Sequence, residues 1–183
     1  MLGGMTRATE DKTLVLIRHA KAEQAPGKPD HDRSLTDKGR RDATAAGRWL
    51  NEQGIVAELV ICSTAIRTRE TWDHAAKGGA HTEFVEYRRA VYQGDTEGVL
   101  DSLREDSGEV DTVIVVGHAP TIPTLASVLC DGEGSREAHQ ALADGYPTCG
   151  LAVLRFNGEW ADLDRGDASL ERFHVARDKA DTR

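Results

Sequence analysis

The sequence predicts an α/β domain of three layers, in which helices cover both faces of a mostly parallel, mixed central sheet. Two continuous apolar runs, residues 14–17 and 113–116, have the length and composition of fully buried strands. Along the chain, strand-like apolar runs alternate with segments in which apolar residues have helical spacing. This order is typical of parallel strands joined by helices. A later apolar run that ends at Asn157-Gly158 predicts a hairpin, which adds an antiparallel strand to the sheet.

The first half of the chain divides into an arm, two strands, a long loop and two helices. Thr36 is the expected N-cap of the first helix, and Ser63 and Thr64 offer capping oxygens for the second. In order, the predicted elements are a loose N-terminal arm (1–12), a strand (13–18), a loop rich in Pro, Gly, Asp and Lys that passes over its end (20–35), a helix ending near residue 54, a strand (58–62) and a helix from about residue 65.

The second half of the chain repeats the alternation and then closes with the hairpin. Its predicted elements are a strand (83–87), a helix (96–104), a strand (112–116), a helix through residue 129, a polar and partly loop-like stretch (131–147), two hairpin strands (150–156 and 159–164) and a short terminal helix after residue 166. We therefore expect a single domain over residues 13–165, followed by a C-terminal tail of residues 166–183.

Composition narrows the classes of protein that this chain can belong to. Its 183 residues are 39% hydrophobic and 30% charged, which suits one folded domain. The net charge of −8 disfavours binding to nucleic acid or anionic membranes. Cys62, Cys130 and Cys149 lack metal-ligand spacing, and an odd number argues against a disulfide framework. The sequence contains no segment that resembles a signal peptide or a membrane span, so we expect a cytoplasmic protein. A monomer is the default expectation.

Polar side chains that suit anion chemistry follow the carboxyl ends of three predicted strands. Arg18 and His19 follow the first strand, Arg67 lies in the helix start after the second, and His118 follows the strand of residues 112–116. Ligands of open α/β sheets collect at these ends, where helix N-termini also favour phosphate groups. The four residues therefore predict one pocket for a small anion.

Three segments resemble the successive motifs of the histidine phosphatase superfamily, which shares the phosphoglycerate mutase fold. They are Arg18-His19-Ala20, Ser63-Thr64-Ala65-Ile66-Arg67-Thr68-Arg69-Glu70-Thr71 and Val116-Gly117-His118-Ala119-Pro120. Each segment alone would be a weak signal, whereas their joint order and internal spacing are specific. The short length and the segment Asp32-Arg33-Ser34-Leu35-Thr36 resemble the bacterial phosphohistidine phosphatase branch in particular.

The resemblance implies a role for each of the four residues. A neutral His19 would attack phosphorus and form a phosphohistidine intermediate, which water then hydrolyses. Arg18 and Arg67 would clamp the phosphoryl oxygens and disfavour the imidazolium form of His19. His118 would bind the phosphoryl group and stabilise the charge that develops in the transition state. The resemblance implies no metal and no cofactor.

The identity of a proton donor for the leaving group is open at the level of the sequence. Glu86 is the nearest candidate, followed by Glu83, although neither lies in a convincing motif. For Glu86, an exposed surface position without a catalytic role is the favoured interpretation. The loop residues 30–32 are a second source of the proton. A third option is a phosphoramidate such as phosphohistidine, whose labile P–N bond needs little acid.

Alternatives remain for the residues and for the function. The histidines could merely cap strand ends, and Arg69 could replace Arg67 as the ligand, although Arg67 lies nearer the strand end. Ala20 replaces the usual glycine of the family and Glu70 a frequent glutamine, which puts the size of the substrate in doubt. The leading function is a protein phosphohistidine phosphatase. Rivals are a phosphatase of small phosphomonoesters and a non-catalytic phosphoryl-binding module; a mutase is the least favoured.

Overall fold

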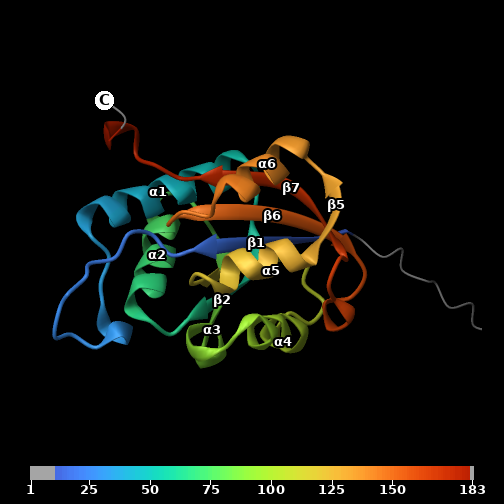
Figure 1. Cartoon of the computed structure of the whole chain (residues 1–183), viewed down its shortest axis with the longest axis horizontal. Coiled ribbons are helices and arrows are strands. Elements are labelled where there is room, and N and C mark those ends of the chain that lie inside the picture. Colours follow the sequence, from blue (N-terminus) through green and yellow to red (C-terminus); the bar gives the residue numbers. More distant parts are fainter. Residues whose placement is uncertain (1–10, 182–183) are drawn as a thin grey trace, which may run out of the picture.

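A computed structural model of the chain describes residues 11–181, and this part contains one seven-stranded sheet in the order β3-β2-β4-β1-β6-β7-β5. The strands are β1 Asp11–Arg18, β2 Ala57–Ser63, β3 Thr82–Arg88, β4 Thr112–Gly117, β5 Cys130–Gly134, β6 Gly150–Asn157 and β7 Ala168–Val175. Neighbouring strands pair in parallel except at β6, which is antiparallel to both β1 and β7. Figure 1 shows β1, β6 and β7 side by side in this order. The predicted mostly parallel, mixed sheet is confirmed.

Helices cover both faces of the sheet and enclose two apolar cores. The helices are α1 Asp37–Glu52, α2 Ile66–Lys77, α3 Arg89–Gln93, α4 Thr96–Asp106, α5 Thr121–Leu129 and α6 Arg136–Asp144, with short 3-10 helices η1 Asp30–Asp32, η2 Trp160–Asp162 and η3 Lys179–Asp181. One core includes Leu50 of α1 and Trp72 of α2, and the other includes Leu103 of α4 and Leu125 of α5. The three-layer architecture is therefore as predicted.

The sequence explains why β1 lies at the centre of these layers. Side chains alternate across a strand, so Leu14 and Leu16 enter the core under α4 and α5 while Val15 and Ile17 enter the core under α1 and α2. All four are essentially inaccessible to solvent. Their burial on both faces fixes the register of β1 and hence the position of the residues that follow it.

Helix α1 begins and packs as its sequence requires. The side chain of Thr36 accepts a hydrogen bond from the amide of Gly39, so Thr36 is the N-cap that the sequence predicts. Gly47 lets α1 approach α2 closely, since a Cβ atom at this position would lie 1.8 Å from the carbonyl oxygen of Ala75. The close contact holds α2 in place, and α2 carries Arg67.

The predicted hairpin after β6 is wrong in its second strand. Asn157 ends β6 as expected, but the next residues form η2, and Trp160 is completely buried with its indole nitrogen 2.6 Å from the carbonyl oxygen of Val110. This hydrogen bond and the burial of the ring stabilise the turn over the extended conformation that a strand of residues 159–164 would need. The partner of β6 is β7, which begins about ten residues after β6 ends.

The predicted terminal helix after residue 166 is also wrong, because these residues form β7. Leu170, Phe173 and Ala176 have a spacing that fits a helix, but Ala168 and Leu170 are buried while Ser169 between them is less so, which is the alternation of a strand. Residues 168–175 pair with β6 on one side and β5 on the other, so they belong to the sheet and not to a tail.

Three further differences concern smaller segments. Helix α6 and most of β5 lie in the stretch of residues 131–147, and the short helix α3 follows β3 directly; none of these three elements was predicted. The second helix begins at Ile66 with Ala65 as N-cap, so neither Ser63 nor Thr64 caps it directly. Of the predicted arm, Asp11 and Lys12 belong to β1, and residues 1–10 lie outside the described part of the chain. Within residues 11–181, none of the helices combines the length and the hydrophobicity that crossing a membrane requires.

Candidate active site

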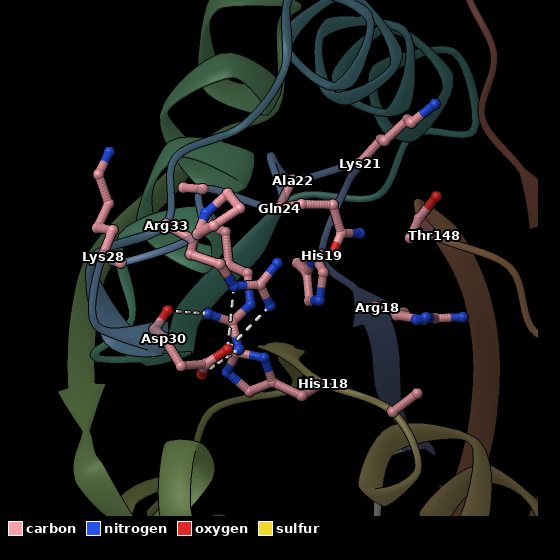
Figure 2. Close-up of a pocket in the computed structure, with 15 residues that line it drawn as sticks. Arg18, His19, Lys21, Ala22, Gln24, Lys28, Asp30, Arg33, His118 and Thr148 are labelled. Carbon is pink, nitrogen blue, oxygen red and sulfur yellow. Dashed lines mark hydrogen bonds and ion pairs between the residues drawn. The ribbon is translucent and has the colours of Figure 1, made fainter.

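A cavity of about 750 Å³ lies at the carboxyl ends of β1, β2 and β4. The four predicted site residues Arg18, His19, Arg67 and His118 all line this cavity. They lie at or shortly after the ends of three neighbouring strands, since β4 lies between β1 and β2 in the sheet. Figure 2 shows the rings of His19 and His118 close to one another, with Lys28, Asp30 and Arg33 of the loop of residues 20–35 nearby. The structure thus brings together residues that are up to 100 positions apart.

His19 is held with one ring nitrogen engaged and the other available. Its amide donates to the carbonyl oxygen of Gly117 at 2.9 Å, which ties the end of β1 to the end of β4. Its Nδ1 lies 2.7 Å from the carbonyl oxygen of Ala20. Because a carbonyl oxygen only accepts hydrogen bonds, Nδ1 must carry the proton, and Nε2 keeps its lone pair. This is the tautomer that a nucleophilic histidine needs.

His118 lies beside His19 and is buried. The ring centroids of the two histidines are 5.3 Å apart. His118 Nε2 is 2.7 Å from the hydroxyl oxygen of Ser63 at the end of β2, whereas His118 Nδ1 is buried without a hydrogen-bond partner among the described residues. A buried polar nitrogen without a partner is uncommon in folded proteins and is consistent with a site that a ligand completes.

The two arginines add positive charge to the lining of the cavity. Arg67 lies in the first turn of α2, is 6% exposed, and donates to the carbonyl oxygen and the carboxylate of Asp30 at 2.7 and 3.0 Å. Arg18 donates to the carbonyl oxygen of Tyr146 at 2.8 Å. The Nε atoms of both arginines are buried and have no partner among the described residues. Together with His118 Nδ1, these are three buried polar nitrogens without a partner that belong to residues lining one cavity.

The environment keeps both histidines neutral. Burial lowers the pKa of His19 to about 4, with a further contribution from the positive charges of Arg67 and Arg18, although the hydrogen bond to Ala20 acts in the opposite direction. Burial also lowers the pKa of His118 to about 3, again with a contribution from Arg67. At neutral pH both rings are therefore uncharged, and the positive charge of the site belongs to its arginine and lysine side chains.

We predict that His19 and His118 stay neutral under mildly acidic conditions. An ordinary histidine is about half protonated near pH 6.5, but the folded pKa values near 4 and 3 mean that neither ring gains a proton until the pH falls well below 6. In the unfolded chain the same rings take up protons near pH 6.5. The free energy of unfolding therefore decreases as the pH falls from 6.5 toward 4. Histidine ring NMR shifts recorded between pH 5 and 8 test this, with the urea-unfolded chain as reference; a midpoint near 6.5 for His19 would contradict it.

The loop of residues 20–35 supplies further residues of the cavity, and Asp30 is the one of the three proton-donor candidates 30–32 that lines it. Asp30 also contacts Arg33 Nε at 3.0 Å and Tyr92 Oη at 3.2 Å, so its carboxylate links the loop to α2 and α3. Although burial acts in the opposite direction, hydrogen bonds from Arg33 and Arg67 lower the pKa of Asp30. Other loop residues that line the cavity are Lys21, Ala22, Gln24, Ala25, Pro26, Gly27 and Lys28. A loop without periodicity gives no sequence signal of which side chains face inward.

The structure does not bring Glu86 to the cavity. Glu86 lies on β3 at the edge of the sheet, with β2 between this strand and β4, and its carboxylate pairs with Arg88 at 3.4 Å. Glu83 is an exposed residue of the same strand. The predicted proton donor is therefore misplaced, because the cavity forms at the ends of the central strands while β3 runs along the margin.

Arg69, the alternative to Arg67, is directed away from the cavity. Its guanidinium group stacks over the ring of Tyr87 on β3, 4.4 Å from the ring centroid. Arg67, two positions earlier on α2, points to the opposite side and lines the cavity. Among the remaining histidines of the described chain, His31 lies near the site, where its Nε2 is 3.1 Å from the hydroxyl oxygen of Thr64.

The fold and the cavity define an α/β protein whose cavity at the strand ends is lined by two neutral histidines and by arginines. Comparison with known proteins gives the family. Residues 14–99 match the model of the histidine phosphatase superfamily, branch 1. Two relatives of uncharacterised function, from Mycobacterium leprae and Mycobacterium tuberculosis, are 38% identical over 88% of this chain and 100% of their own length. The chain belongs to the histidine phosphatase superfamily.

Solved structures agree with this assignment. The chain is similar to a candidate phosphohistidine phosphatase SixA from Nakamurella multipartitia, with 37% identity, a TM-score of 0.80, and coverage of 93% of this chain and 99% of the other. A candidate SixA from Agrobacterium tumefaciens has 30% identity and a TM-score of 0.71 over 89% and 97% of the two chains. The structure of the protein histidine phosphatase SixA complexed with tungstate shares the fold, with 20% identity and a TM-score of 0.72 over 93% and 99%.

Proposed function

We propose that this protein is a phosphatase that removes the phosphoryl group of a protein phosphohistidine through a phosphohistidine intermediate on His19. The observation that carries the proposal is the pair of neighbouring, neutral imidazoles that share one cavity with two arginines at the ends of β1, β2 and β4. Two guanidinium groups supply the positive charge that a phosphoryl group requires, so the proposed reaction uses no metal.

In the first step, the lone pair of His19 Nε2 attacks the phosphorus atom of the substrate. The new P–N bond forms as the bond to the leaving group breaks, and the leaving group departs with the bonding electron pair and takes up a proton. The hydrogen bond between Nδ1 and the carbonyl oxygen of Ala20 fixes the ring for this attack. In the second step, water attacks the phosphorylated His19, which releases inorganic phosphate and restores the free ring.

Arg18, Arg67 and His118 stabilise the phosphoryl group during both steps. The buried and unpartnered nitrogens of these three residues would donate to the phosphoryl oxygens, on which negative charge is concentrated. Arg67 is oriented for this role by its two hydrogen bonds to Asp30. Because the donors are fixed before the substrate arrives, they need little reorganisation during the reaction.

The site favours a leaving group that needs no strong acid from the protein. Among the described residues that line the cavity, Asp30 is the only carboxylate, and its contacts with Arg33 and Arg67 favour its ionised form. An ester oxygen leaves poorly without a proton donor, whereas the imidazole of phosphohistidine leaves readily once its ring is protonated by solvent. This argument, and the similarity to the candidate phosphohistidine phosphatases SixA, support phosphohistidine as the substrate.

The test compares substrate classes at equal enzyme concentration. A phosphohistidine-containing protein, p-nitrophenyl phosphate and a sugar phosphate serve as substrates, with release of inorganic phosphate as the readout. We expect kcat/KM to be highest for the phosphohistidine protein, by about tenfold or more. A tenfold ratio corresponds to a difference of about 1.4 kcal/mol in activation free energy between two substrates. Glu86→Gln is the control and should match the wild type on every substrate. Activity confined to small esters would contradict the substrate class, and no turnover at all would favour a phosphoryl-binding module.

A further inference from the structure

We propose that Ser63 is a positioning residue that fixes the tautomer of His118, so that Nδ1 of this ring carries the proton and donates to the phosphoryl group. The family motifs include both residues, but their contact becomes visible only in the structure. The kinetic consequence rests on the proposed function, whereas the tautomer itself is a property of the free protein.

Ser63 contacts His118 from outside the set of residues that line the cavity. It is the last residue of β2, is completely buried, and is not among the residues that line the cavity, whereas His118 is. The 2.7 Å contact between Ser63 Oγ and His118 Nε2 joins the ends of two neighbouring parallel strands. With Nε2 engaged in this way, Nδ1 is the ring nitrogen left for a ligand.

The hydrogen-bond partners of Ser63 determine which group donates. The amide of Ala65 donates to Ser63 Oγ at 3.2 Å, and an amide cannot accept the hydroxyl proton. Among the described residues, the contact with His118 Nε2 is the other hydrogen bond of this hydroxyl. If Nε2 carried a proton, the buried hydroxyl proton would have no acceptor, at a cost typical of an unsatisfied polar group. The satisfied arrangement has Ser63 donating and Nε2 accepting.

The proton on Nδ1 then suits an anion. Nδ1 is buried and has no partner among the described residues, so an N–H at this position has an unmet need for an acceptor oxygen. Burial keeps the ring neutral, as described above, and the ring therefore carries a single proton whose location matters. In the opposite tautomer, the lone pair of Nδ1 would face the phosphoryl oxygens and repel them.

The first experiment measures the tautomer directly, without reference to activity. Nitrogen-15 and proton correlation spectra of the histidine rings at pH 7 distinguish Nδ1–H from Nε2–H. We expect His118 of the wild type to be the Nδ1–H form, and Ser63→Ala to populate the Nε2–H form. A wild-type ring in the Nε2–H form would overturn the inference, as would an Nδ1–H form that is unchanged in Ser63→Ala.

The second experiment measures the consequence for turnover of a phosphohistidine protein. We expect Ser63→Ala to lower kcat/KM by about tenfold or more, because the lost donor contacts the phosphoryl group. Ser63→Thr keeps the hydroxyl and should restore much of the rate and the Nδ1–H signal. Ser107→Ala is the matched control, since Ser107 is a buried serine without a hydroxyl partner among the described residues, and it should match the wild type.

The two experiments separate the failure of this inference from the failure of the proposed function. If the wild type has no phosphatase activity, the proposed function fails, and the spectra together with calorimetric binding of inorganic phosphate still decide the role of Ser63. In that case Ser63→Ala should weaken phosphate binding about tenfold. Equal losses in Ser63→Ala and Ser63→Thr without a change of tautomer would indicate a packing role and overturn the inference.

Discussion

Replacing His19 with glutamine is expected to abolish turnover while leaving the fold intact. Glutamine is similar in size and polar, but it lacks a ring nitrogen with a lone pair that can attack phosphorus. We expect kcat to fall by a factor on the order of 10⁴ or more, because the nucleophile and the step that it performs are lost together. Rapid-quench experiments with a ³²P-labelled substrate should show an acid-labile phosphoenzyme in the wild type and none in His19→Gln.

The control for this variant is a histidine outside the site. His81 lies in the exposed segment before β3, so His81→Gln should retain both the labelled intermediate and full turnover. Thermal unfolding followed by circular dichroism checks that His19→Gln is folded. Turnover or labelling that survives in a folded His19→Gln would show that another residue is the nucleophile.

Replacing Arg67 with alanine is expected to have the second-largest effect. Arg67 is nearly buried among groups that face the cavity, and the loss of a fixed positive group costs transition-state stabilisation of about 3 kcal/mol, which is a factor of about 10² to 10³ in kcat/KM. Arg67→Lys should recover only part of this loss, since an ammonium group cannot replace the planar fork of the guanidinium group. Steady-state kinetics on the phosphohistidine protein provide the measurement.

Arg69→Ala is the matched control for Arg67, because the two arginines lie two positions apart on α2. The side chain of Arg69 stacks on Tyr87 outside the cavity, so its removal should leave kcat/KM within about twofold of the wild type. The opposite result, a large loss in Arg69→Ala and a small one in Arg67→Ala, would reassign the phosphate ligand.

The sequence predicted the central part of the fold because buried parallel strands leave a strong signal. The apolar runs of β1 and β4 have no other plausible location than the middle of a sheet, and the residues that directly follow them must then lie at its edge. This is why Arg18, His19 and His118 could be placed together before their coordinates were known. Arg67 followed from its position in the first turn of a helix after β2.

What the sequence did not predict depends on contacts between distant segments. The same residues of β7 satisfy a helical and a strand pattern, and only pairing with β6 decides between them. The burial of Trp160 against Val110 redirects the chain after Asn157. In the site, the contacts of Asp30 with Arg67 and Tyr92 depend on the path of a long irregular loop, for which residue spacing carries no information.

The hydrogen bond from the amide of His19 to the carbonyl oxygen of Gly117 has a consequence for how the protein denatures. Since this bond continues the ladder between β1 and β4, the backbone beneath the cavity cannot separate unless the centre of the sheet separates as well. Local opening of the surrounding loop leaves that backbone in place. The backbone of the site therefore keeps its geometry until the whole sheet unfolds. Thermal inactivation should coincide with complete unfolding rather than precede it.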